Sequence, residues 1–147
     1  FNIAINDLDE FNVGPVSDSN ATTNNVDENA SVGTVVQITA LAADADATNN
    51  TITYSLQNND GGRFQIDSVT GVVTVAGAID READGPTRTI TVRATSSDSS
   101  FTDQNFNIAI NDLDEFNVGA VSDSNATTNN VDENASVGTV VQITALA

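Results

Sequence analysis

Carboxylate side chains recur in short clusters along this 147-residue chain, and their types and spacing suit the binding of a cation. In chain order the clusters are Asp7-Leu8-Asp9-Glu10, Glu28, Asp44-Ala45-Asp46, Asp80-Arg81-Glu82, Asp112-Leu113-Asp114-Glu115 and Glu133. Alternate carboxylates at the end of a strand can converge on one point, and calcium takes six to eight oxygen ligands at about 2.3–2.6 Å. Together, these clusters predict calcium sites.

The charge balance limits the classes of partner that this chain can bind. The chain has 21 acidic and four basic residues, a formal net charge of −17, and neither His nor Cys. Binding to nucleic acid needs a basic surface for the phosphates, so nucleic acid is excluded as a partner. Anionic membrane surfaces are disfavoured too, and no apolar run approaches the ~20 residues of a membrane span. Oxygen ligands favour calcium or magnesium over transition metals.

Each cluster has a simpler interpretation when it is taken alone. An Asp-x-Asp pair is usually a solvated loop, Asp80-Arg81-Glu82 can be a surface ion pair, and Glu28 can protect an exposed strand edge. Paired carboxylates also hydrolyse glycosides. Clusters that recur with their scaffold would, however, give a row of identical active sites. We therefore predict metal ligands and no enzyme.

The chain repeats itself with a period of 105 residues. Residues 1–42 recur as residues 106–147, and the one difference is Pro15 against Ala120. A period of one domain's length predicts beads on a string. We expect the last strand and linker of a preceding repeat in 1–11, one complete repeat with its linker in 12–116, and the opening strands of a truncated repeat in 117–147. The end strands would lack partners, which strand exchange between molecules could supply.

Apolar and polar residues alternate with a period of two along several short segments. They are 36–40, 52–56, 64–66, 73–75, 90–94 and 106–110. The turn clusters Asn58–Gly62 and Asp67–Gly71 separate some of them. This pattern predicts an all-β chain, an antiparallel Greek-key β-sandwich of about seven strands, with no helix.

Seven stretches, in order, carry a resemblance to a known family: Glu28-Asn29 with Gly33, Ala43–Asp46, Ile52–Leu56, Phe64–Val73, Ile79–Glu82, Thr91–Ala94 and Ile110–Glu115. They resemble the cadherin repeat, and specifically the repeats of large bacterial calcium-dependent surface adhesins, in extender regions of the RTX type. The resemblance implies a cadherin/immunoglobulin-like sandwich, an extracellular location at the cell surface, and a part in cell adhesion and biofilm formation.

The resemblance also implies which residues hold calcium at each linker. Those from the domain before the linker are Glu28, Asp80 and Glu82. The linker itself gives Asp112, Asp114, Glu115 and the carbonyl of Phe116, and the upstream linker gives Asp7, Asp9, Glu10 and Phe11. Those from the domain after a linker are Asp44, Asp46 and the carbonyl of Asn49. Glu133 is the copy of Glu28 in the next repeat.

Two departures from the family pattern matter. Ser96 stands where the family has an Asp ligand, with Asp98 nearby, so the number of ions at each linker is two or three. The stretch 12–25 is long and rich in Ser, Asn and Thr, and it could form a hairpin, a loop or a longer first strand.

Two functions of a non-enzymatic kind follow from these features. One is a structural spacer, in which calcium at the linkers locks neighbouring repeats of the same chain into a rod that projects an adhesive tip. The alternative is an adhesive module that binds carbohydrate or a like domain on another cell. The few aromatic residues, six Phe and one Tyr, fit better in a core than on a sugar platform.

Overall fold

The computed structural model describes residues 1–4 and 10–147. Within these residues the chain forms two compact units, unit 1 (Phe1–Leu113) and unit 2 (Asp114–Ala147). Strands β1 to β8 and the helix α1 lie in unit 1, and strands β9 and β10 lie in unit 2. The expected domain limits at 1–11, 12–116 and 117–147 stay a prediction.

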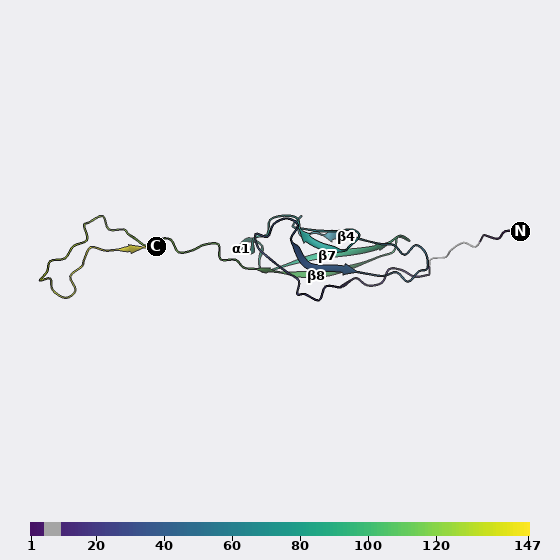
Figure 1. Ribbon diagram of the computed structural model, residues 1–147, viewed down its shortest axis with the longest axis horizontal. Helices are drawn as coiled ribbons and strands as arrows, with labels where there is room; N and C mark the ends of the chain where they lie inside the picture. Colours follow the sequence, from purple (N-terminus) through teal and green to yellow (C-terminus); the bar gives the residue numbers. More distant parts are fainter. Residues whose placement is uncertain (5–9) are drawn as a thin grey trace. The chain divides into compact units, whose positions relative to one another are not determined.

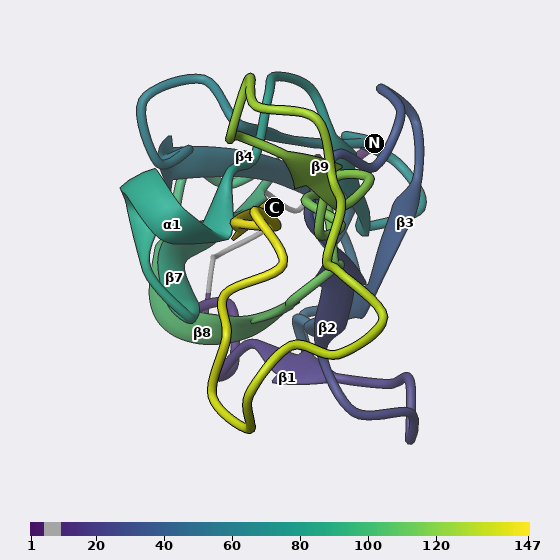
Figure 2. The same cartoon turned by 90° about the vertical axis from the view of Figure 1, so that its left-hand side faces the viewer.

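Unit 1 is a sandwich of two four-stranded sheets. The order in the first sheet is β1 (Ser17–Asp18), β3 (Val35–Leu41), β6 (Val72–Val75), β5 (Phe64–Ile66). The order in the second is β2 (Asn25–Asp27), β8 (Phe101–Asn111), β7 (Thr87–Ser96), β4 (Ile52–Asn58). Figure 1 shows β7 and β8 running along unit 1, and in Figure 2 the second sheet curves around one side with β3 opposite.

This order confirms the predicted Greek-key sandwich. The first sheet has the strand order A-B-E-D of an immunoglobulin-type fold, and the second has C, F and G with one further edge strand. The further strand is β2, which pairs in parallel with β8, whereas the other pairs are antiparallel. The described residues of unit 1 form eight strands, close to the seven expected, and the stretch before Glu28 supplies one short strand to each sheet.

The predicted alternation puts one side of each strand into the core. Val36, Ile38 and Ala40 of β3 are buried, and Ile90, Val92 and Ala94 of β7 face them from the other sheet. The core is completed by Val13, Val16, Val26, Tyr54, Phe64, Val73, Val75, Ile79, Ile108 and Ile110. Small and β-branched side chains thus fill most of the space between the sheets, and Tyr54 and Phe64 are the aromatic residues among the core residues described.

The prediction of no helix was wrong at one place. Residues Arg81–Asp84 form the single helical turn α1. The carboxylate of Asp80 accepts a hydrogen bond from the backbone N–H of Ala83 at 2.9 Å and so caps the turn. Gly85, with φ of +86°, ends it. Four residues are too few for a helical periodicity to show in the sequence.

The turn predicted at Asp67–Gly71 is present, and it is an Asx turn. Its carboxylate accepts the backbone N–H groups of Val69 at 3.0 Å and Thr70 at 2.7 Å, which holds its pKa below the usual range, the bond from Thr70 contributing most. Gly71 closes the turn with φ of +72°, and a Cβ there would lie 2.4 Å from the carbonyl oxygen of Ala40. Only glycine therefore lets this turn approach β3.

Unit 2 contains one short antiparallel pair, β9 (Ser122–Asp123) with β10 (Ala145–Leu146). Its large apolar residues are exposed, although five of them have copies that are core in unit 1, namely Val13, Val16, Val26, Val36 and Ile38. Ile143 is 56% exposed, whereas Ile38, one period earlier, is fully buried. The same residues thus remain without a core in this unit.

Replacing Gly71 by Ala should destabilise unit 1 much more than the same change at Gly62. Gly62 also has positive φ (+90°), but no atom lies within 4 Å of an added Cβ. We expect a loss of about 1 kcal/mol for Gly62→Ala from backbone conformation alone. For Gly71→Ala the clash with Ala40 should bring the loss to about 3 kcal/mol or more. Urea denaturation in EGTA measures both, and equal losses would contradict this account of the turn.

Candidate metal centre

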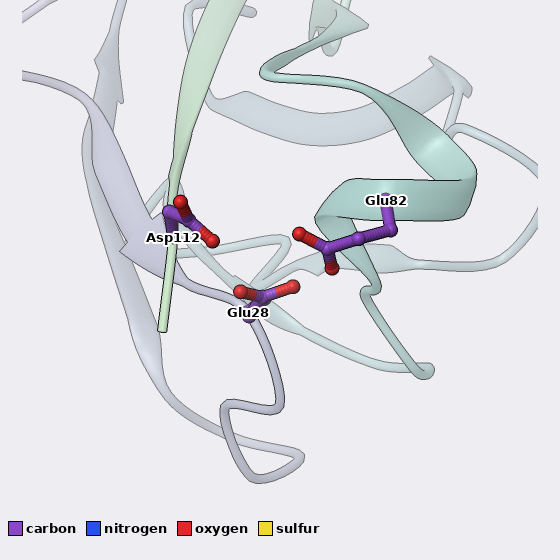
Figure 3. A group of neighbouring side chains, drawn as sticks. All are labelled: Glu28, Glu82 and Asp112. Carbon is purple, nitrogen blue, oxygen red and sulfur yellow. The ribbon is translucent and has the colours of Figure 1, made fainter. Parts of the chain in front are cut away.

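Three carboxylates from distant parts of the sequence converge at the end of unit 1 where α1 lies. An oxygen of each of Glu28, Glu82 and Asp112 lies within 4.8 Å of the others. Glu28 follows β2, Glu82 is on α1, and Asp112 comes directly after β8 (Figure 3). Among the residues that the structure describes, this is the one group of three or more metal-binding side chains so close together. All three were predicted as calcium ligands.

Glu28 is held in a fixed position by backbone donors. It is only 1% exposed, and its two carboxylate oxygens accept the N–H groups of Leu113 at 2.6 Å and Arg81 at 2.8 Å. These bonds, that from Leu113 first and that from Arg81 next, lower the pKa of Glu28 despite its burial. Glu28 therefore stays ionised and joins α1 to the residue that follows Asp112.

The pKa of Glu82 is shifted upward, opposite to that of Glu28. A hydrogen bond from its own backbone N–H lowers the pKa of Glu82. Partial desolvation and the nearby Glu28 and Asp112 raise it by more than this, so the net shift of the pKa is upward. The raised pKa of Glu82 thus reflects the repulsion that Glu28 and Asp112 exert on its charged form. A divalent cation would relieve the same repulsion, and an all-oxygen donor set fits calcium.

Two arginines hold α1 in place. Asp84, the last residue of α1, accepts a bidentate pair of bonds from Arg63, with Nε at 2.9 Å, and these bonds lower the pKa of Asp84. Arg88 donates to the backbone carbonyl of Asp84 at 2.6 Å and to both oxygens of Asp60. This pair of arginines around Asp84, called here the arginine bracket, could not be predicted from the sequence, because its members come from separate turns.

The opposite end of unit 1, called here the hairpin end, carries the β7–β8 turn and the second set of predicted ligands. Asp44 accepts the N–H of Asp46 at 3.0 Å, and Asp46 is buried and lies 3.3 Å from the backbone N of Glu10. The hydroxyl of Ser96, at the end of β7, is a hydrogen-bond donor to the carboxylate of Asp44 and to the carbonyl of Asn49. The pKa of Asp44 is lowered, first by Ser96 and next by the N–H of Asp46.

The other predicted ligands are distributed as follows. Asp80 caps α1 with one oxygen and is not part of the three-carboxylate group. Phe11 is 55% exposed in unit 1, and Phe116 is 87% exposed in unit 2. Asp114, Glu115 and Glu133 lie in unit 2, where Glu133 is exposed although its copy Glu28 is buried. Asp7 and Asp9 lie outside the described residues.

The cadherin domain family model matches residues 22–111, which include Glu28, Asp44, Asp46, Asp80 and Glu82. The chain belongs to the cadherin domain family. Cadherin domains are extracellular adhesion modules that are in general not enzymes; they generally bind calcium and contact neighbouring repeats. None of the described residues lies in a helix with the length and apolar character to cross a membrane.

Individual cadherins share substantial identity with this chain. Cadherin-20 of Xenopus laevis is 42% identical over 82 residues, which are 54% of this chain and 10% of that protein. Cadherin-7 of Gallus gallus is 36% identical over 142 residues, which are 95% of this chain and 17% of that protein. The chain thus spans a small part of these relatives.

Solved cadherin structures share the sandwich. Domains EC1-3 of mouse clustered PcdhgC3 give a TM-score of 0.55 at 29% identity, covering 61% of this chain and 30% of that one. Domains 1-4 of Protocadherin Gamma B7 give a TM-score of 0.62 and cover 91% of this chain and 32% of that one; at 22% identity this likeness concerns the fold alone.

Removing Asp84 should loosen α1 in this cadherin domain. We expect Asp84→Ala to lower the melting temperature in EGTA by several degrees, because the partly buried Arg63 loses its carboxylate partner and keeps only the carbonyl of Asp60. Asp103→Ala is the matched control, since Asp103 also binds an arginine, Arg93, through two bonds but is more exposed (37% against 11% for Asp84). Exposed pairs contribute little. Scanning calorimetry measures the melting temperature of both variants. An equal or larger effect of Asp103→Ala would contradict the claim that Arg63 stabilises α1 through Asp84.

Proposed function

We propose that this chain is part of a calcium-rigidified spacer, an extender region of an extracellular bacterial adhesin that projects an adhesive tip from the cell surface. The observation that carries the proposal is the convergence of Glu28 and Glu82 with Asp112, the first of the predicted linker ligands. Asp112 and Leu113 end unit 1, and Asp114 begins unit 2.

Electrostatics favours a cation at this group. The ion pairs among the described residues involve Asp60, Asp84 and Asp103, and none involves the three converging carboxylates. Their mutual repulsion therefore has no basic side chain to offset it. Calcium would offset it and could take further oxygens from Asp114, Glu115 and the carbonyl of Phe116, which we propose as the linker ligands.

Such an ion would restrict the junction between repeats. Ligands on both sides of Leu113 would be held by one ion, so rotation of the linker would separate ligands from the metal. Calcium sites of extracellular modules have dissociation constants of about 10⁻⁴–10⁻³ M. At about 100 times the dissociation constant, one site adds ~2.7 kcal/mol to the stability of the bound form. This is a large share of the stability of a typical domain.

The spacer role and the bacterial source have separate support. The relatives described above are animal cadherins. The bacterial adhesin part of the proposal rests on the near-identity of consecutive repeats, which differ in this chain at one position of 42, and on the resemblance noted in the sequence. Repeats so alike would give many equivalent junctions, which suits a spacer whose length matters more than any one surface.

Calcium should stabilise the chain through Asp112. For a dissociation constant of ~0.1 mM, we expect 10 mM calcium to raise the melting temperature by roughly 10 °C over its value in EGTA. Asp112→Asn should remove more than half of this rise, because it deletes one charge from the group. Asp132→Asn is the control, since Asp132 is exposed and outside the predicted ligand set. Calorimetry that finds no rise in the unchanged chain, or equal effects of both variants, would refute the site.

Calcium should also stiffen a chain of several such repeats. Small-angle X-ray scattering should give a larger radius of gyration and a larger maximum dimension in 10 mM calcium than in EGTA. Asp112→Asn in each repeat should give the EGTA profile at both conditions. A scattering profile that does not change with calcium would remove the spacer role, even if calcium binds.

A further inference from the structure

The hairpin end of unit 1 gathers carboxylates as the α1 end does, but it holds them differently. Asp44 accepts one hydrogen bond at each carboxylate oxygen, from the N–H of Asp46 at 3.0 Å and from the hydroxyl of Ser96 at 2.5 Å. Asp44, Asp46 and Asp98 do not form a group of three within 4.8 Å among the residues that the structure describes. What connects the oxygens here is a hydroxyl group.

The Ser96 hydroxyl lies between two oxygens that the sequence predicted as metal ligands. Its single proton is shared between two acceptors, Oδ2 of Asp44 at 2.5 Å and the carbonyl oxygen of Asn49 at 2.9 Å. A calcium ion binding both oxygens would lie about 2.3–2.6 Å from each. The hydroxyl oxygen therefore takes almost the position of such an ion. Ser96 is 3% exposed, and strand pairing with Ile52 holds its backbone, so turning the hydroxyl away would leave buried polar atoms without their hydrogen bonds.

Neighbouring groups at the hairpin end are also held without a cation. Asp98 accepts the backbone N–H of Ser100 at 2.6 Å and its hydroxyl at 3.0 Å, so both oxygens are engaged in closing the β7–β8 turn. The Ser100 hydroxyl in turn accepts the N–H of Val13 at 2.9 Å. Gly14 donates to the carbonyl of Ala43 at 2.8 Å, and Thr102 donates to the carbonyl of Val13 at 3.1 Å. The chain that enters from the upstream linker is thus fastened by ordinary hydrogen bonds.

The geometry points to Ser96 as the residue that sets the number of ions at each linker: its hydroxyl stands in place of one calcium ion and clamps Asp44 to the Asn49 carbonyl. Asp46 remains a proposed ligand of the linker. The hydroxyl clamp, defined as Ser96 with these two oxygens, is independent of calcium. The ion count, in contrast, rests on the proposed function.

The clamp is tested first in EGTA, on the whole chain, with Ser96→Ala. Loss of the hydroxyl should free the loop that contains Asp44 and Asn49, and the amides of Asp46 and Thr48 should exchange with deuterium about tenfold faster, as expected for one lost hydrogen bond. Ser97→Ala is the matched control, because Ser97 is exposed and its hydroxyl accepts only the N–H of Thr51 outside the clamp. Equal exchange in both variants would overturn the clamp.

The ion count is tested with calcium alone, by isothermal titration calorimetry and native mass spectrometry. Ser96→Asp should bind one calcium ion more per chain than the unchanged protein, because a carboxylate then replaces the hydroxyl between Asp44 and Asn49. Ser97→Asp adds the same charge beside the clamp and should leave the number of ions unchanged. Ser96→Ala should not reduce the number of ions.

The outcomes separate this inference from the proposed function. A loss of one ion in Ser96→Ala would make Ser96 a ligand, and the inference would be wrong. Equal ion numbers in Ser96→Asp and the unchanged chain, with calcium bound in both, would overturn the ion count alone. If no form of the chain binds calcium, the proposed function and the ion count fail together, and the exchange rates in EGTA still decide the clamp.

Discussion

Repulsion among Glu28, Glu82 and Asp112 is the interaction that the rest of unit 1 must offset, because their oxygens lie within 4.8 Å of one another. The four arginines act elsewhere. Three of them form ion pairs with Asp60, Asp84 and Asp103, and the guanidinium of Arg81 donates to the carbonyl of Ile110. The fold instead places two backbone N–H groups on Glu28, and the repulsion that remains contributes to the raised pKa of Glu82. The backbone hydrogen bonds thus hold Glu28 at a position where a cation would lower the energy further.

The two ends of the sandwich manage their negative charge by different means. At the α1 end, carboxylates from three segments face one another, and the positions of α1 and β8 determine their spacing. At the hairpin end, Ser96 and Ser100 supply protons that satisfy Asp44 and Asp98. A hydroxyl proton binds one carboxylate at short range, whereas a divalent ion collects six or more oxygens. Calcium dependence should therefore be concentrated at the α1 end of each repeat.

Much of the candidate site could be predicted because its residues belong to repeated, locally recognisable patterns. Glu28, Glu82 and Asp112 were all named from the sequence, as was the turn from Asp67 to Gly71. The role of Asp80 as a helix cap was missed, because a one-turn helix leaves no periodic signal. The bracket of Arg63 and Arg88 around Asp84 was missed too, because nothing in a sequence relates residues that meet only when three turns are packed together.

The two copies of the repeated segment separate what is local from what is not. By itself, the sequence determined the short pairing of Ser17–Asp18 with Ala40–Leu41, since it recurs in the same register as β9 with β10 in unit 2. Asp18 and its copy Asp123 each accept the equivalent two N–H groups, so this pairing needs only residues of the repeated segment.

Tertiary structure alone decided the rest. Val26 is 4% exposed in β2 beside β8, whereas its copy Val131 lies in no strand and is 52% exposed. An isolated strand gains little, because its hydrogen bonds and its apolar face both need partners from residues far away in the sequence. For the same reason Glu28 is a buried, fixed ligand candidate while the identical Glu133 is an exposed side chain: only Glu28 has the N–H groups of Arg81 and Leu113 to hold it.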